Sequence, residues 1–162
     1  MVPMPFRGYR VQVREEWIDY NGHLSDGYYA VVFSAANELL LEQLGVSADY
    51  RAATGRAMYT VEARLRYLAE VGRGDALAAE SSLVGADAKR LRVHTLLRLE
   101  SGFVVATGEN LYLHVNTARG AVEPFPDDVQ TRVDRLLRAH TELDPVTDQP
   151  PVLGALGART PE

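Results

Sequence analysis

Hydrophobic residues recur at helical spacing between residues 28 and 44, which is the most regular pattern in the chain. The repeating positions lie three or four residues apart: Tyr29, Val32, Phe33, Ala36, Leu40 and Leu44. This spacing predicts one long helix, and Gly45 is expected to end it. Because few positions between 28 and 41 are charged, we expect neighbouring elements to cover the helix on most sides.

Alternation of apolar and polar residues predicts five strands. A short strand at 10–14 precedes the helix, and four more follow it at 58–68, 76–85, 90–100 and 103–116. Short turns join the last four, so consecutive strands are expected to pair antiparallel. In the strand at 58–68, Tyr59 and Tyr67 share the apolar face, so these side chains could either pack in the core or bind a ligand.

A second, amphipathic helix is predicted at 126–140, and residues 141–162 are rich in proline and glycine and are predicted to form a tail. The length of 162 residues fits a single domain, which we place at 1–140. One antiparallel sheet and one long helix bury each other if the sheet curls around the helix. The expected class is therefore α+β, with a curled sheet wrapped around a central helix.

Composition and charge narrow the classes of function. The net charge of -5 argues against nonspecific binding to nucleic acid, although arginines could still hold an anionic small molecule. No apolar run reaches the roughly 18 residues of a membrane span, and the first ten residues lack the apolar segment of a signal peptide. The absence of cysteine excludes disulfides, thiolate metal sites and cysteine nucleophiles. We expect a cytoplasmic protein that binds neither nucleic acid nor membrane.

A polar cluster, "DYNGHLSD" (19–26), stands directly before the long helix. The free N–H groups and the positive dipole end of a helix start can hold a developing oxyanion. Asp19 could act as a general base toward water, or attack a carbonyl itself. One or two backbone amides between Gly22 and Leu24 could polarise that carbonyl.

The same cluster also fits an ordinary capped loop. Ser25 or Asp26 can cap the helix, and Asp19 can hold an Asx turn. A lone histidine such as His23 is more often structural than catalytic. Composition and spacing leave both interpretations open.

The element order and the motif "WIDYNGHLSDGYY" (17–29) resemble the hot-dog fold acyl-CoA thioesterases, in the 4-hydroxybenzoyl-CoA thioesterase-like branch. That branch commonly carries an Asp, a Gly-His pair and often an Asn two residues later; the matching positions here are Asp19, Gly22, His23 and, in place of the Asn, Ser25. The resemblance implies that Asp19 is the catalytic carboxylate and that the helix N-terminus holds the thioester oxygen. Asn21 and His23 are then expected to hold the water or the substrate. It also implies a homodimer, or a dimer of dimers, with the site between subunits.

Three further segments carry a narrower likeness: "YTVEARLRYLAEVGRGD" (59–75), "DAKRLRVH" (87–94) and "ATGENLYLHVNTARG" (106–120). They are similar to the thioesterase domain fused to carnitine dehydrogenases and to its stand-alone relatives, which are associated with betainyl-CoA or related thioesters. Ala63-Arg64 departs from that pattern, in which a polar residue and a His are expected. Aromatic faces suit a quaternary ammonium. The predicted substrate-binding residues are Leu24, Ser25, Tyr28, Tyr29, Tyr59 and Glu62.

Four basic residues form the predicted site for coenzyme A, although they could instead belong to a solvated strand face: Arg64, Lys89, Arg90 and Arg92. Glu38, in the middle of the helix, is interpreted as exposed or dimer-facing. The expected enzyme hydrolyses a small acyl-CoA, betainyl-CoA or another short polar one, to a carboxylate and free CoA, with no metal and no redox cofactor. The alternative is a protein that binds an acyl-CoA or acyl carrier without turnover, or a hot-dog dehydratase. The usual histidine-bearing signature of the dehydratases is not found.

Overall fold

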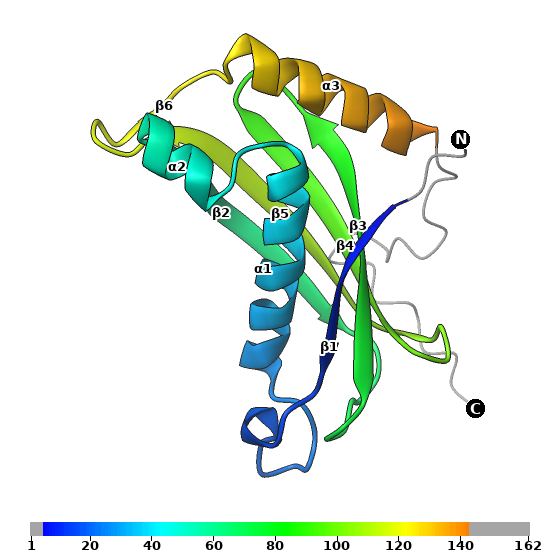
Figure 1. Ribbon diagram of the computed structural model, residues 1–162. Helices are drawn as coiled ribbons and strands as arrows, with labels where there is room; N and C mark the ends of the chain where they lie inside the picture. The colour runs from blue at the N-terminus through cyan, green and yellow to red at the C-terminus, as the bar shows by residue number, and fades with distance from the viewer. Residues whose placement is uncertain (1–4, 143–162) are drawn as a thin grey trace, which may run out of the picture.

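The computed structural model describes residues 5–142, in which one antiparallel sheet curls around a central helix (Figure 1). The predicted order of a strand, a long helix, four strands and a short helix is confirmed, and α2, β6 and a 3₁₀ turn are additions. The elements in chain order are β1 (Phe6–Gln12), the 3₁₀ turn (Glu15–Trp17), α1 (Asp26–Gln43), α2 (Ala48–Thr54), β2 (Arg56–Tyr67), β3 (Ala76–Ala86), β4 (Arg90–Leu99), β5 (Val104–Asn116), β6 (Ala121–Val122) and α3 (Asp127–Thr141).

The strand order corrects one expectation. The order in the sheet is β1-β3-β4-β5-β2, with β6 beside β5, so β2 and β3 do not pair across a short turn as expected. β2 pairs with β5 and forms one edge of the sheet, while β3 pairs with β1 and β4. The segment 68–75 is therefore a crossover between distant strands. Its residue Val71 is fully buried, and its carbonyl oxygen accepts the N–H of Leu24 at 2.8 Å, which ties the crossover to the loop before α1.

α1 packs on the concave face of the sheet through two groups of buried residues. Phe33 and Leu97 belong to the group at the N-terminal half of α1, and Leu40 and Leu91 to the group at its C-terminal half. The close approach depends on Gly108 of β5, where an added Cβ would lie 2.9 Å from the ring of Phe33. A larger residue at this position would push α1 away from the sheet.

α3 packs over the C-terminal end of α1 (Figure 1). Val129 and Val133 are fully buried there. Arg132 Nε donates to the carbonyl oxygen of Leu44 at 2.8 Å, so a side chain from α3 satisfies one of the carbonyls left free where α1 ends. Gly45 follows with a φ of 73°, which confirms the predicted helix stop.

A register shift in β2 changes which side chains share a face. The pairing with β5 shifts between Thr60 and Glu62, because Val61 is an extra residue in the strand. Tyr59 therefore lies on the face opposite α1, whereas Tyr67 lies on the α1 side. Both are about half exposed, at 48% and 51%, so the interpretation of these tyrosines as core residues is wrong for the described chain.

α1 is less covered than expected. Val31, Ser34 and Glu38 on its outer face are exposed, which corrects the expectation of cover on most sides and agrees with the interpretation of Glu38 as a surface residue. Within residues 5–142, no helix combines the length and the apolar character needed to cross a membrane. α3 continues to Thr141, and the predicted tail from residue 143 onward lies outside the described residues.

Candidate active site

The loop before α1 is closed by its own backbone. The N–H of Asp19 donates to the carbonyl oxygen of His23 at 3.0 Å. Between them Gly22 has a φ of 81°, a left-handed conformation that glycine adopts at low cost. With the tie between Leu24 and Val71, this turn holds the loop against the crossover after β2.

A cleft of about 680 Å³ opens between this loop, the first turn of α1 and the crossover. Several predicted site residues line it together: Asp19, Asn21, His23, Leu24, Ser25 and Tyr29. The lining also includes residues outside that predicted set: Tyr20, Asp26, Tyr67, Leu68, Ala69 and Glu70. The start of α1 and the end of β2, far apart in the sequence, thus share one cleft.

Asp19 is partly buried in this cleft. The N–H of Asn21 donates to Asp19 Oδ1 at 2.8 Å, while no donor within residues 5–142 is bonded to Oδ2. The Asx turn named as an alternative is therefore present. It holds the carboxylate in place and leaves one oxygen available to a water or a substrate carbon, so the turn and a catalytic role are compatible.

Only part of the backbone at the helix start is available to a ligand. The amides of Gly22 and Leu24 donate to carbonyl oxygens of the protein, so neither is free to polarise a substrate carbonyl. Asp26 Oδ1 accepts the N–H of Gly27 at 2.8 Å. The N–H of His23 has no acceptor among the described residues, and it is the remaining donor of the predicted set.

Three side-chain contacts join the two walls of the cleft. His23 Nε2 lies 3.2 Å from Glu70 Oε2. The rings of Tyr29 and Tyr67 meet edge to face, with centroids 5.0 Å apart and planes at 66°. Burial raises the pKa of both tyrosines, so both stay neutral at physiological pH and present uncharged rings. The hydroxyl of the buried Tyr29 donates to the carbonyl oxygen of Ala69 at 3.4 Å, which anchors the pair.

Some predicted site residues do not line the cleft: Gly22, Tyr28, Tyr59 and Glu62. Tyr28 stacks on Trp17, with ring centroids 5.6 Å apart and planes at 19°, so it packs α1 against the preceding loop. Tyr59 and Glu62 are exposed on the edge strand β2. Within one chain they are outside the site.

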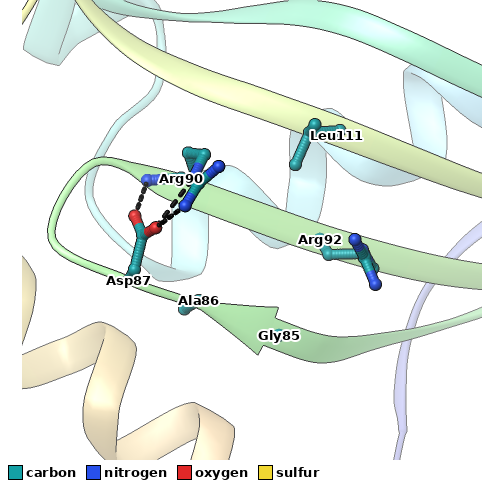
Figure 2. Close-up of a pocket in the computed structure, with 6 residues that line it drawn as sticks. All are labelled: Gly85, Ala86, Asp87, Arg90, Arg92 and Leu111. Carbon is teal, nitrogen blue, oxygen red and sulfur yellow. Dashed lines mark hydrogen bonds and ion pairs between the residues drawn. The ribbon is translucent and has the colours of Figure 1, made fainter.

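Three of the predicted coenzyme A residues, Arg64, Arg90 and Arg92, lie on the face of the sheet opposite α1. Arg90 and Arg92 of β4 line a hollow of about 220 Å³ beside the β3–β4 turn (Figure 2). Arg90 Nε donates to Asp87 Oδ2 at 2.6 Å, and this bond holds the pKa of the Asp87 carboxyl below its usual range. Arg92 Nε lies 3.5 Å from Glu109 Oε1, and Arg64 pairs in register with the same Glu109. Arg90 and Arg92 are thus each paired with an acidic neighbour.

The lining residues outside the predicted set come mainly from the end of β2 and from the crossover. Strict alternation put Tyr67 in the core, and local spacing does not relate Glu70 to the loop at 19–26. One signal was available: the segment 68–75 is longer than a tight hairpin turn, so it also permits a crossover between distant strands. Lys89 follows Asp87 in the β3–β4 turn but does not line the hollow.

Several known proteins are similar to this chain in sequence or in fold. An L-carnitine dehydrogenase/betainyl-CoA thioesterase of Agrobacterium fabrum is 42% identical over 132 residues, which cover 82% of this chain and 27% of that protein. A betainyl-CoA thioesterase of Pseudomonas aeruginosa is 39% identical over 136 residues, covering 83% and 86%. A Staphylococcus aureus protein solved in complex with CoA superposes with a TM-score of 0.84 at 25% identity, covering 95% and 94%. The chain therefore spans about a quarter of the Agrobacterium relative and most of the other two.

A curled antiparallel sheet around one helix is the hot-dog fold, and the solved structures that superpose on this chain share it. The chain belongs to the thioesterase-like superfamily, whose family model matches residues 13–133. The expectations of a hot-dog fold and of a thioester hydrolase in the 4-hydroxybenzoyl-CoA thioesterase-like branch are confirmed at the level of this family.

Proposed function

We propose that the protein hydrolyses acyl-CoA thioesters to a carboxylate and free CoA, with Asp19 as the catalytic carboxylate. The main support is the position of Asp19 in the cleft, with Oδ1 held by the N–H of Asn21 and Oδ2 without a donor among the described residues. Membership of the thioesterase-like superfamily supports the same chemistry.

In the proposed reaction the thioester carbon lies beside Asp19, and its oxygen lies at the amide of His23 and the positive end of α1. Acting as a base, Asp19 takes a proton from water, whose oxygen forms the new C–O bond. The C–S bond breaks, and the CoA thiolate receives the proton. Acting as a nucleophile, Asp19 attacks the carbonyl carbon and expels the CoA thiolate, which leaves an anhydride; water then hydrolyses the anhydride and supplies the proton that the thiolate takes up. Both routes use the free Oδ2 and call for no metal or redox cofactor.

We place a small polar acyl group in the cleft, with betainyl-CoA as the first candidate substrate. The names of the Agrobacterium and Pseudomonas relatives support this choice. The nucleotide phosphates of CoA would bind the hollow lined by Arg90 and Arg92, with Arg64 and Lys89 beside it. The Staphylococcus protein, which was solved in complex with CoA, supports the proposal that this chain binds the CoA part of the substrate.

The proposed assembly is a homodimer that pairs through β2. This strand has twelve residues, lies at the end of the sheet order, and exposes the apolar side chains of Tyr59, Val61 and Tyr67. A long apolar edge strand invites pairing with another strand. Antiparallel pairing near the middle of β2 would bring the start of the partner's β2 beside the cleft, so Tyr59 and Glu62 would act in the site of the partner. We also propose a cytoplasmic location.

Asp19→Asn tests the proposed function. We expect the variant to lose about 10²–10⁴-fold in kcat, the usual contribution of a positioned acid or base, while CoA still binds. Thiol release would be followed over aromatic, short aliphatic and quaternary-ammonium acyl-CoAs, and CoA affinity by calorimetry. Single turnover in heavy-oxygen water separates the two routes, because only the nucleophile route places the label in Asp19.

Asp49→Asn is the matched control, since Asp49 lies on α2, is exposed and does not line the cleft. It should retain wild-type turnover. A wild-type protein that is inactive on the whole panel yet binds CoA would point to a binding protein instead. Full activity of Asp19→Asn would remove Asp19 from the chemistry.

A further inference from the structure

The charges that line the cleft are mostly negative. Asp19, Asp26 and Glu70 line it, whereas His23 is the only basic residue of the lining within residues 5–142. The phosphates of CoA are anionic, so they are poorly matched to this end of the site. The acyl group is the part of the substrate that must reach Asp19. A negative cleft therefore favours an acyl group with a positive charge.

Tyr67 adds an aromatic surface beside these carboxylates. Its side chain is half exposed in the cleft, and the buried Tyr29 behind it holds the ring edge to face. The carboxylate of Asp26 adds to the rise in the pKa of Tyr67 that burial causes, and Glu70 does the same for Tyr29. Each carboxylate therefore lies near enough to one of the two rings to affect the pKa of its hydroxyl.

Glu70 is positioned by a contact across the cleft. His23 Nε2 lies 3.2 Å from Glu70 Oε2, and an N–H at Nε2 can hold this carboxylate whether the ring is neutral or protonated. The side chain of Glu70 is 78% exposed, so its charge faces the open cleft. An aromatic face and a carboxylate thus stand together at the rim of the site.

We infer that Tyr67 and Glu70 are specificity-determining residues that select an acyl group with a permanent positive charge over a neutral group of the same shape. The inference rests on the proposed hydrolysis of acyl-CoA. A quaternary ammonium has no N–H to donate, so aromatic faces and negative charges are what recognise it. A neutral group of the same shape fills the same space, but neither the aromatic face nor the negative charge stabilises it in this way.

The test compares two thioesters that differ by one atom of the acyl group. Betainyl-CoA carries a trimethylammonium, and 3,3-dimethylbutanoyl-CoA carries a tert-butyl group in its place. The kcat/KM of each would be measured for the wild type, Glu70→Gln, Tyr67→Leu and Tyr67→Phe. Gln keeps an acceptor for His23, and Phe keeps the ring. Glu42→Gln, at the far end of α1, removes the same charge outside the cleft.

The wild type should prefer betainyl-CoA by about tenfold or more. Glu70→Gln and Tyr67→Leu should each reduce that preference by about 2- to 30-fold, the range of a cation–aromatic contact. The loss should come from a higher KM for betainyl-CoA at unchanged kcat, since the lost contact binds the substrate and the transition state equally. The kcat/KM for the neutral thioester should stay within about twofold of the wild-type value. Tyr67→Phe and Glu42→Gln should keep the preference.

Equal kcat/KM of the wild type for the two thioesters would overturn the inference and leave the thioesterase function intact. An unchanged preference in both Glu70→Gln and Tyr67→Leu would also overturn it, as would a parallel loss on both thioesters. If the wild type hydrolyses neither, the inference fails, and the thiol-release panel then shows whether hydrolysis of other thioesters stands.

Discussion

His94 is a buried histidine whose Nε2 has no hydrogen-bond partner in the part of the chain that the structure describes. It lies on the face of the sheet opposite α1, between Ser82 of β3 and Glu109 of β5. Burial lowers the pKa of its imidazole, and the nearby Glu109 carboxylate opposes this shift without reversing it. At this residue desolvation outweighs the neighbouring charge, so the folded protein holds His94 neutral.

This shift makes stability depend on pH with a definite sign. Above about pH 6.5 His94 is neutral in both states and has no effect on the free energy of unfolding. Below that pH the unfolded chain binds a proton that the folded chain resists, so the free energy of unfolding falls as pH falls. His94→Leu should lose less stability than the wild type between pH 7.5 and 5.5, measured by urea unfolding. Equal losses would show that His94 does not carry the effect.

At the scale of elements, α1 is joined to the sheet by a buried polar network as well as by apolar contacts. Asn37 Nδ2 donates to Asn110 Oδ1 at 3.2 Å and to the hydroxyl of Tyr112 at 2.9 Å. Thr95 Oγ1 donates to Asn37 Oδ1 at 2.8 Å and lies 2.9 Å from the hydroxyl of Ser81. One side chain of α1 therefore links β3, β4 and β5. Such a network favours one position of the helix on the sheet, because any shift would leave polar groups unpaired.

Asn37→Leu tests this network, since leucine fills a similar volume and makes no hydrogen bond. We expect the free energy of unfolding to fall by about 2–4 kcal/mol, because the groups on Asn110, Thr95 and Tyr112 lose their partner while buried. Ser34→Ala, on the exposed face of α1, should change it by less than about 0.5 kcal/mol. Wild-type stability of Asn37→Leu in urea unfolding would mean that the network makes no net contribution.

At the scale of the whole molecule, several exposed apolar side chains lie on the edge strand β2, where we propose that a second chain pairs. Tyr59, Val61 and Tyr67 are exposed on β2, Leu68 follows them, and Val31 is exposed on α1. β2 ends at the cleft, which is lined by its last residue, Tyr67, and by the following Leu68. Assembly and catalysis are therefore expected to depend on each other.

Val61→Lys would place a charge on this edge and block pairing of β2. We expect the mass in light-scattering chromatography to fall from about twice the chain mass of 17.9 kDa toward that mass. Turnover should fall with it, because the partner's β2 would be lost from the site. Phe103→Lys, at the exposed turn between β4 and β5, should leave the mass unchanged. A wild type that runs as a monomer would contradict the proposed dimer.

The sequence by itself determined the two longer helices, most strand limits and the acidic motif before α1. These features depend on periodicity and turn chemistry between residues a few positions apart, such as Gly22 in the turn and Gly45 at the helix end. The motif also carried the family resemblance and predicted Asp19 as a site residue, and Asp19 lines the cleft.

Only the tertiary structure decided which strands pair and what faces Asp19. Burial of Val71 and the hydrogen bond from the N–H of Leu24 hold the crossover against the loop before α1. Tyr67 and Glu70 therefore line the cleft. The extra residue in β2 decided that Tyr59 faces away, because one inserted residue reverses the alternation that follows. Such outcomes depend on contacts between residues far apart in the chain, and local spacing does not encode them.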